Sequence, residues 1–466
     1  MLTLNKKPGL FCISFDAVAL SGIIVEFLKV AKIFYQNDYL IYLDLGYEIK
    51  ADKNKFFHAY TNEKKLFPVW VELIKIIDEP FKNYSPELVY EIFKVVAADS
   101  SKLYLYEQII EDYSNYIAGQ LLQAWNKLNI QVVIVENGTL PENIIFTKSL
   151  YKAIESYGAQ HQLNKYVIWR DHDLMWSSEA NLSKYGRPPY PDIPKLSPSK
   201  HIAHIVLHQA DYEEAVKWSP NVSISILKNT FQPLSLTKSL ANKIRSEFRE
   251  YYHIPEKAYL IARFTRIIPQ KKIDRDIHLL HLLYKICQSQ QKTPNIYLAV
   301  AGSKTENPQE FQRLTDIITN YQLDDYVIFT GSLIPVGFAK YCHERSVMDL
   351  IIASDLCSFM TSYYYESFGN PISEAICLER AYLTTCYRRY QHVYGSLGYQ
   401  GLVFAISEEH DVQVDRQFAL QVWELLTDKK KRESLIIHNS QLMQAQQKND
   451  LPLTKKMNNL LNLRLI

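Results

Sequence analysis

Two glutamates, Glu366 and Glu374, lie in a stretch whose pattern would turn both toward one cleft. Residues 355–360 before them form a short apolar run typical of a buried strand. Gly369 supplies the backbone freedom of a sharp turn, and Pro371 suits the first position of a following helix. Such a helix points its first N–H groups at a phosphate, and carboxylates accept hydrogen bonds from sugar or ribose hydroxyls. The alternative is an ordinary loop followed by a helix-capping glutamate.

Two cations form a second candidate group. Arg266 and Lys271 follow the apolar run 258–264. Two fixed cations can bind a phosphate, and cations aimed at negative charge that develops during a reaction lower its barrier. Arginine can hold a phosphate with a bidentate fork, whereas lysine acts as a point charge. The alternative is a solvated basic loop, because Lys272 and Arg275 are neighbours.

A third polar cluster, residues 170–176, follows the strand pattern 166–169. Ligands of open α/β sheets bind beyond the carboxyl ends of the strands. His172 could therefore donate a hydrogen bond to a sugar hydroxyl, and the alternative is a satisfied structural histidine. The side chains of three consecutive residues, 171–173, do not converge on one metal, so we expect no metal site.

These residues need a scaffold of alternating strands and helices. The strand, helix and strand patterns over 10–15, 23–36 and 39–43 predict a Rossmann-like opening, and a second alternation begins near residue 258. A length of 466 residues also predicts two domains. We expect an N-terminal domain over 1–252, a C-terminal domain over 253–431 and a helical tail over 432–466, broken at Pro452.

Two parts of the first half lie outside this alternation. Residues 51–127 are mostly helical in pattern and rich in Tyr, Phe and Lys, and include a long helix over 103–128. The proline-rich loop 185–191, with Arg187, is predicted to be a lid or an acceptor edge. No G-x-G-x-x-G occurs in the chain, which argues against a hydride-transfer enzyme.

The stretch from Glu366 to Glu374, with Phe368 and Gly369, resembles the Glu-x7-Glu signature of retaining glycosyltransferases of the GT-B fold. These belong to the large glycosyltransferase group 1 (family 4-type), which includes sucrose and mannosyl transferases. Ser367 stands where the usual motif has a glycine. The resemblance covers residues 259–404 and is thin in the N-terminal half.

Two further elements carry the same resemblance. Arg266 and Lys271 are similar to the family's Arg-x4-Lys element, with Lys272 where a glycine is usual. In the first loop, Ser21 and Gly22 stand where the family has a pair of glycines that admit the donor diphosphate. A plain helix N-cap at Ser21 is the alternative there.

The resemblance implies an α/β protein of the GT-B fold, in which two Rossmann-like domains face a central cleft and the C-terminal helix crosses back to the N-terminal domain. It implies transfer of a hexosyl group, with retention, from a nucleotide sugar of the GDP-mannose or UDP-glucose type to an unknown hydroxyl acceptor. Glu366 would grip sugar hydroxyls and Glu374 the ribose, without a metal or a cofactor. The residues assigned in this way are His172, Arg266, Lys271 and Glu366 for catalysis, and Gly22, Gly302, Leu333, Phe368, Gly369, Asn370, Pro371 and Glu374 for donor binding.

Composition excludes several other classes. A net charge of +2 without a basic block gives no support for nucleic-acid binding. The six cysteines have no zinc spacing and indicate free thiols in a reducing compartment. With no signal peptide and no apolar run of membrane-spanning length, we expect a cytoplasmic protein. An aromatic and lysine-rich face within 51–127 could rest on a membrane surface, although a core with a solvated rim is favoured.

Rival functions remain. A GT-B phosphorylase or a sugar-nucleotide epimerase is the nearest enzyme, although the context of a pyridoxal-binding lysine is missing. A catalytically degenerate nucleotide-sugar-binding or scaffold protein is the alternative from another class, and the departures at Ser21, Ser367 and Lys272 favour it.

Overall fold

The chain forms two compact units. Unit 1 consists of Met1–Lys228, Gly337–Ala339 and Leu451–Ile466, and unit 2 of Asn229–Val336 and Lys340–Asp450. The computed structural model describes residues 7–15, 21–47, 56–57, 63–98, 100–176, 193–234, 236–336, 338 and 345–465. The predicted loop 185–191, with Arg187, and Cys342 lie outside these residues.

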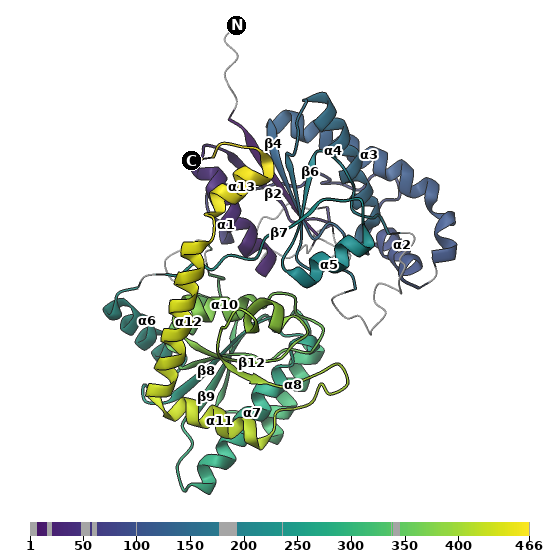
Figure 1. Ribbon diagram of the computed structural model, residues 1–466. Helices are drawn as coiled ribbons and strands as arrows, with labels where there is room; N and C mark the ends of the chain where they lie inside the picture. Colours follow the sequence, from purple (N-terminus) through teal and green to yellow (C-terminus); the bar gives the residue numbers. More distant parts are fainter. Residues whose placement is uncertain are drawn as a thin grey trace. The chain divides into compact units, whose positions relative to one another are not determined.

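Unit 1 is built on a seven-stranded parallel sheet with the order β3-β2-β1-β4-β5-β6-β7 (Figure 1). Its central strands are mainly apolar and almost entirely buried, as in a parallel sheet covered on both faces. The strands are β1 (Gly9–Ser14), β2 (Leu40–Asp44), β3 (Val71–Leu73), β4 (Ile130–Glu136), β5 (Val167–Asp171), β6 (Ile202–Val206) and β7 (Ile224–Ile226).

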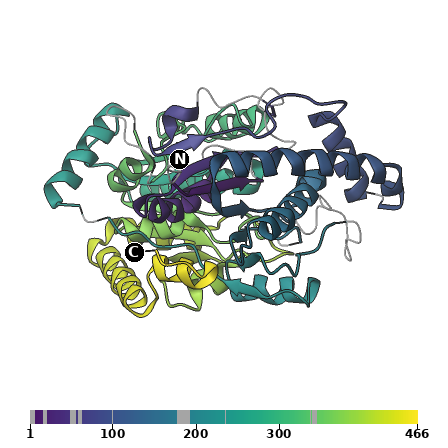
Figure 2. The same cartoon turned by 90° about the horizontal axis from the view of Figure 1, so that it is seen from above.

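The helices of unit 1 follow the apolar periodicity of the sequence with one difference. The long helix expected over 103–128 begins at Glu107, after a 3-10 turn at Ser100–Leu105, and packs along α4 (Figures 1 and 2). β3 lies in the region expected to be mostly helical, which corrects that expectation. The helices are α1 (Gly22–Gln36), α2 (Pro86–Ala98), α3 (Glu107–Leu128), α4 (Ile144–Gln160), α5 (Gln209–Trp218) and α13 (Leu453–Leu461).

Unit 2 repeats the design with a six-stranded parallel sheet of order β10-β9-β8-β11-β12-β13. Its strands are β8 (Tyr259–Phe264), β9 (Ile296–Ala301), β10 (Val327–Gly331), β11 (Leu356–Phe359), β12 (Ala381–Thr385) and β13 (Leu402–Phe404). Its helices are α6 (Lys238–Tyr251), α7 (Ile273–Ser289), α8 (Pro308–Asn320), α9 (Val347–Ala353), α10 (Asn370–Cys377), α11 (Arg416–Thr427) and α12 (Lys429–Asn449).

Both sheets reverse their strand order at one place, between β1 and β4 in unit 1 and between β8 and β11 in unit 2. This order is that of a Rossmann-like fold, and ligands bind at the switch point beyond the carboxyl ends of the strands. The prediction of two Rossmann-like domains is confirmed. The last helix, α13, starts after Pro452, packs beside β5 and belongs to unit 1.

The boundary between the units lies at Lys228, whereas the sequence placed it at residue 252. Helix α6 belongs to unit 2 because two of its arginines bind there. Arg249 Nε and Arg245 Nη1 donate to the carbonyl of Ala353 at 3.1 and 2.8 Å, and both side chains reach Asp355 at 3.1 and 3.3 Å. The predicted tail also divides, since α12 stays in unit 2.

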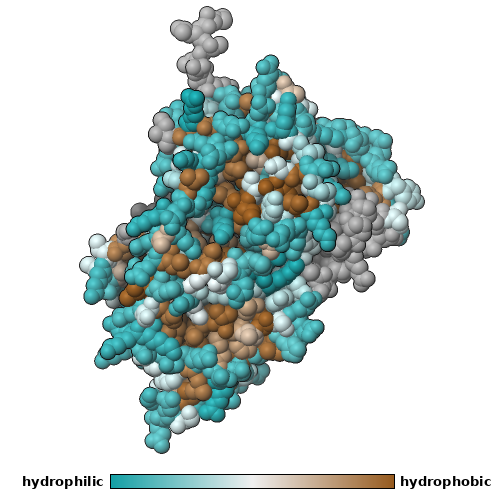
Figure 3. Space-filling view, viewed as in Figure 1, coloured by the Kyte–Doolittle hydropathy of each residue, from teal (hydrophilic) through white to brown (hydrophobic). Residues whose placement is uncertain are grey.

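The surface is typical of a globular protein. In the view of Figure 3, hydrophilic residues cover most of the periphery of each unit, and apolar residues show mainly nearer its middle. None of the helices in the described ranges combines the length and the apolar character that crossing a bilayer requires. Free thiols are buried at Cys12, Cys287, Cys357 and Cys377 and half-buried at Cys386.

Candidate active site

The loop that follows β8 carries the predicted cations of unit 2. It ends in a short 3-10 turn, Pro269–Lys271, and α7 begins after Lys272. Lys272 adopts a left-handed conformation with φ +51°. That conformation favours glycine, which explains why the resembling motif has glycine at this position. Because Lys272 has a Cβ, this left-handed conformation costs about 1–2 kcal/mol of conformational strain.

Lys271 and Glu366 are brought together although 95 residues separate them in the sequence. Lys271 Nζ donates to Glu366 Oε2 at 2.5 Å, with the side chains 12% and 15% exposed. The ammonium also lies over the Phe359 and Tyr365 rings, 5.4 and 4.9 Å from their centroids. A largely buried cation and a largely buried carboxylate therefore form an ion pair at the edge of the sheet.

The pairing of β8 with β11 explains this meeting. Leu356 pairs with Ile261 in parallel register, so the two strands end at the same edge. Beyond the edge, Thr361 Oγ1 and the Ser362 N–H donate to the Gln270 carbonyl at 3.2 and 3.1 Å. At the switch point of this sheet, the loop after β8 and the loop after β11 are thus hydrogen-bonded to each other.

The alternative of a solvated basic loop around Lys272 and Arg275 is wrong for Arg275. Its guanidinium is buried and donates to the Thr361 carbonyl at 2.6 Å and to the Val412 carbonyl at 3.1 Å, and it forms an ion pair with Asp411. Arg275 therefore stabilises the loops. Lys272 Nζ lies 3.9 Å from the Asp411 carboxylate.

Arg266 lies in the same loop, is about two-fifths exposed and pairs with the Glu306 carboxylate. Gly302 follows β9 directly and lies against this loop. A Cβ on Gly302 would come within 2.6 Å of the Thr265 carbonyl oxygen, so only glycine allows the approach. Its N–H donates to the Gly331 carbonyl at 3.0 Å. Gly302 thus has a packing role in the structure, and its predicted role in binding the nucleotide-sugar donor stays a prediction.

The predicted strand, turn and helix at Gly369 are confirmed. Gly369 has φ +82° and precedes the first residue of α10. The helix begins at Asn370, so Pro371 occupies its second position where the sequence suggested the first. Either position suits proline, because the first four N–H groups of a helix have no partner within it. The remaining N–H groups of this turn are the candidate phosphate site.

Two buried tyrosines hold the turn. Tyr387 donates its hydroxyl to the Phe368 carbonyl at 2.7 Å, and Tyr394 donates to the Gly369 carbonyl at 2.9 Å. Phe368 is itself buried. The Gly369 carbonyl also accepts the N–H of Ile372 at 3.0 Å, so both carbonyls of the turn have hydrogen-bond partners.

Glu374, Asn370 and Leu333 complete the predicted donor residues of unit 2. Glu374 is half-buried and is the fifth residue of α10, whereas the sequence placed it in the first turn. Glu374 therefore lies beyond the first turn, whereas it would have to lie in that turn to cap the helix. Asn370 Oδ1 accepts from Asn229 Nδ2 at 3.0 Å, and Leu333 is buried after β10.

The edge of the sheet in unit 1 holds a buried cluster around Glu136, the last residue of β4. Arg170 donates to its carboxylate from Nε at 2.9 Å and from Nη2 at 2.5 Å, and His172 Nε2 lies 2.9 Å away. Burial alone would raise the pKa of Glu136, but Arg170 and His172 lower it to about 2. The N–H of His172 donates to Asn137 Oδ1 at 2.7 Å. His172 is thus held at both its backbone and its ring.

Asp171 lies in the same cluster, and among the described residues no cationic side chain is paired with it. It accepts from Thr139 Oγ1 at 2.7 Å and from the Thr139 N–H at 3.3 Å. Burial raises its pKa to about 7. Within the part of the chain that the structure describes, no three His, Cys, Asp or Glu side chains are grouped to hold a metal ion.

The first loop supports the simpler alternative at Ser21. Ser21 Oγ accepts from the Ile24 N–H at 3.3 Å and caps α1, whose first residue is the exposed Gly22. The N-cap prediction is confirmed, and donor binding by Gly22 stays a prediction. Residues 16–20 lie outside the described residues.

Sequence reasoning missed two buried charges, Glu136 and Arg263. Glu136 ends an apolar strand run, and its position at the carboxyl end of that run was the available signal. Arg263 lies inside the apolar run of β8 and is fully buried. A charge within a buried strand pattern is unusual unless it is paired, and this was a second signal.

Much of unit 2 matches a known protein family. Residues 244–441 match the family Glycosyl transferases group 1, a range that contains Arg266, Lys271, Glu366 and Glu374. No curated protein sequence matches the chain significantly.

Solved structures resemble the whole chain. HepE from Anabaena, solved with UDP and glucose, is 13% identical with a TM-score of 0.57, over 94% of this chain and 95% of that one. Sucrose-phosphate synthase from Thermosynechococcus elongatus is 12% identical with a TM-score of 0.57, over 94% of each chain. WaaG, a glycosyltransferase involved in lipopolysaccharide biosynthesis, is 15% identical with a TM-score of 0.56, over 97% of this chain and 99% of that one. At these identities the likeness establishes the fold, and the chain has the predicted GT-B fold.

Proposed function

We propose that this protein is a glycosyltransferase that moves a hexosyl group from a nucleotide sugar to a hydroxyl acceptor with retention of configuration. The observation that carries the proposal is the pairing of Lys271 with Glu366 at the switch point of the sheet in unit 2. The match of residues 244–441 to glycosyl transferases group 1 supports it. The UDP and glucose bound to HepE support a donor of the UDP-glucose type, with GDP-mannose as the other candidate.

Charge stabilisation explains the proposed chemistry. As the sugar leaves, negative charge grows on the diphosphate, and cations already in place stabilise it without reorganisation. Arg266 and Lys271 supply these cations, and the amides at the start of α10 supply hydrogen-bond donors. In this proposal the side chains of Arg266 and Lys271 neutralise the negative charge of the diphosphate, and no metal or cofactor takes part.

Carboxylates position the rest of the donor. Glu366 accepts hydrogen bonds from sugar hydroxyls, and Glu374 accepts them from the ribose. Because Lys271 already contacts Glu366, the departing phosphate and the sugar hydroxyls lie within reach of one loop pair. Retention follows if the acceptor attacks from the face that the phosphate leaves.

For His172 we propose a hydrogen bond to the sugar through Nδ1. Glu136 is held anionic and can only accept, so Nε2 donates to it. When the ring carries one proton, Nδ1 is then an acceptor for a sugar hydroxyl. This reverses the direction of the bond expected from the sequence.

Ligand-induced stabilisation tests the proposal. We expect one of UDP, GDP or ADP, or one of their sugars, to raise the unfolding midpoint of the protein. A specific ligand at a hundredfold excess over Kd adds about 2.7 kcal/mol to the free energy of unfolding. Arg266→Ala should abolish the gain, and EDTA should leave it unchanged.

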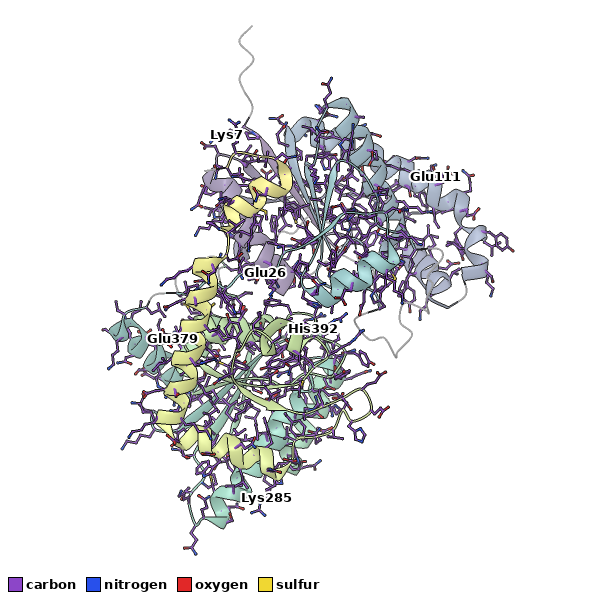
Figure 4. The ribbon with its side chains drawn as sticks, viewed as in Figure 1. Lys7, Glu26, Glu111, Lys285, Glu379 and His392 are labelled. Carbon is purple, nitrogen blue, oxygen red and sulfur yellow. The ribbon has the colours of Figure 1, made fainter. Side chains whose placement is uncertain are left out.

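The matched control is Lys285→Ala, which removes an exposed lysine of α7 that Figure 4 labels. This variant should keep the full ligand response. If no nucleotide shifts the midpoint of the wild-type protein, the transferase proposal is wrong.

A degenerate nucleotide-sugar-binding protein is the second candidate, because Ser367 replaces a glycine of the resembling motif. It would bind the nucleotide without transferring or hydrolysing the sugar. Release of the free nucleotide from its sugar, measured over hours with the protein in excess, separates the two candidates.

A further inference from the structure

A fully buried arginine lies beneath the loop that carries Lys271. Arg263 is 0% exposed and extends from β8. Its Nε donates to Thr265 Oγ1 at 3.1 Å, and its Nη2 donates to the backbone carbonyl of Lys271. Its Nη1 lies 3.6 Å from Asp276 Oδ2 in α7. One guanidinium therefore joins the strand, the end of the loop and the following helix.

The partner of this arginine is also buried. Asp276 is 2% exposed and accepts from Ser358 Oγ of β11. Burial raises the pKa of Asp276 and lowers that of Arg263, while each charge opposes the shift of the other. Replacing a buried ion pair by apolar residues of similar volume is often neutral or stabilising. Fold stability alone therefore gives no reason for these two charges.

The ion pair is joined to the candidate site through Lys271 and one aromatic ring. The Phe359 ring has the Arg263 guanidinium at 5.5 Å and the Lys271 ammonium at 5.4 Å from its centroid. Arg263 thus holds the backbone of Lys271, while Glu366 holds its ammonium at 2.5 Å. Both ends of the lysine are fixed, which is what a preorganised cation requires.

We propose that Arg263, held by Asp276 and Thr265, is a positioning residue that sets Lys271 for binding the diphosphate of the donor. The inference rests on the proposed function, because it assumes that Lys271 contacts that diphosphate. The loop itself has other attachments, since Gln270 accepts bonds from residues 361 and 362 and Arg275 binds the Thr361 carbonyl. Loss of Arg263 should therefore misplace Lys271 without unfolding the loop.

The test compares nucleotide binding in two variants with different chemistry. Arg263→Lys keeps the charge and loses the fork, and the double variant Arg263→Met with Asp276→Asn removes both charges and leaves an acceptor for Ser358. Calorimetric titration with UDP, GDP and ADP, and with the matching nucleosides, gives the contribution of the diphosphate. Because a misplaced Lys271 loses a charge-assisted hydrogen bond to the diphosphate, we expect diphosphate affinity to fall about tenfold or more, with nucleoside affinity unchanged.

Coupling to Lys271 separates positioning from a general loss of stability. In a Lys271→Ala background, Arg263→Lys should change diphosphate affinity less than about twofold, because the lysine that it positions is gone. Arg380→Lys is the matched control. Arg380 also binds backbone carbonyls in unit 2, those of Ile351, Ile352 and Ser354, and its substitution should lower the unfolding midpoint without such coupling.

Three results would overturn the inference. They are wild-type affinity in both Arg263 variants, equal losses for nucleoside and diphosphate, and an undiminished loss in the Lys271→Ala background. Each leaves the proposed function intact as long as Lys271→Ala itself weakens diphosphate binding. If the wild-type protein binds no nucleotide, the proposed function fails, and the positioning role fails with it.

Discussion

At the scale of single residues, the turn before α10 depends on Gly369. Its φ of +82° is unfavourable for other residues, and an added Cβ would lie 2.6 Å from the Tyr387 hydroxyl. We expect Gly369→Ala to cost the left-handed strain of about 1–2 kcal/mol together with the displacement of Tyr387. Chemical denaturation should show a lower free energy of unfolding, and nucleotide binding should weaken because the start of α10 moves.

Gly331→Ala is the matched control for this prediction. Gly331 has a similar φ of +77°, but nothing lies within 4 Å of its added Cβ. The Gly331→Ala variant should therefore lose only the free energy of unfolding that corresponds to the backbone strain. Tyr387→Phe removes the atom in closest contact but also the hydrogen bond to the Phe368 carbonyl, so the two glycine forms are compared within that background. Gly369→Ala should cost less stability in the Tyr387→Phe protein than in the wild type. Equal losses at the two glycines would contradict the packing argument.

Individual site residues differed in how well the sequence predicted them. Lys271 and Glu366 were selected as candidates because each belongs to a motif of the resembling family, and the structure shows that the two side chains form an ion pair. Arg263 and Glu136 were missed because each is a single charge in an apolar strand, and a linear pattern does not show the partner that makes burial possible. Those partners, Asp276 and Arg170, lie on other elements.

At the scale of elements, the sheet edge of unit 1 should respond to acid through Glu136. Its pKa is lowered from an ordinary value of 4.5 to about 2, so between these values the unfolded chain binds more protons. The stability that Glu136 contributes is present above pH 4.5 and is lost as pH falls toward 2. The full loss is about 3 kcal/mol, at about 1.4 kcal/mol per pH unit.

Glu136→Gln removes this titration. The variant should be less stable at neutral pH, because Arg170 loses its buried partner, and its stability should depend less on pH between 4.5 and 3. Urea unfolding across this range measures both effects. Glu433→Gln, at an exposed glutamate of α12, should keep the wild-type pH dependence. A Glu136→Gln curve parallel to that of the wild type would refute the assigned role.

Strands and helices were predictable where burial produces continuous patterns. The central parallel strands are covered on both faces, so they appear as apolar runs, and β1, α1 and β2 lie within one residue of the bounds predicted over 10–15, 23–36 and 39–43. β3 has only three residues, of which one is buried, and such an edge strand leaves little pattern. The unit boundary was misplaced because α6 belongs to unit 2 through the contacts of Arg245 and Arg249, which no local pattern shows.

At the scale of the whole molecule, each unit has its own hydrophobic core. One core gathers the strands β1, β4 and β5 with α3 and α4, and the other gathers β8, β9 and α7 with α11. Chains with separate cores depart from a single cooperative transition. We therefore expect calorimetry to resolve two unfolding transitions.

The tryptophans allow the two transitions to be assigned. Five of the six, at positions 70, 125, 169, 176 and 218, lie in unit 1, and Trp423 lies in unit 2. Intrinsic fluorescence should therefore follow unit 1, and Trp423→Phe should make it a reporter of unit 1 alone. Because the candidate phosphate-binding residues lie in unit 2, a bound nucleotide should raise the calorimetric transition that Trp423→Phe fluorescence does not report. At a hundredfold excess over Kd the gain is about 2.7 kcal/mol. A nucleotide that shifted only the fluorescence transition would instead place its main binding site in unit 1 and contradict the assignment of Arg266 and Lys271 to the diphosphate.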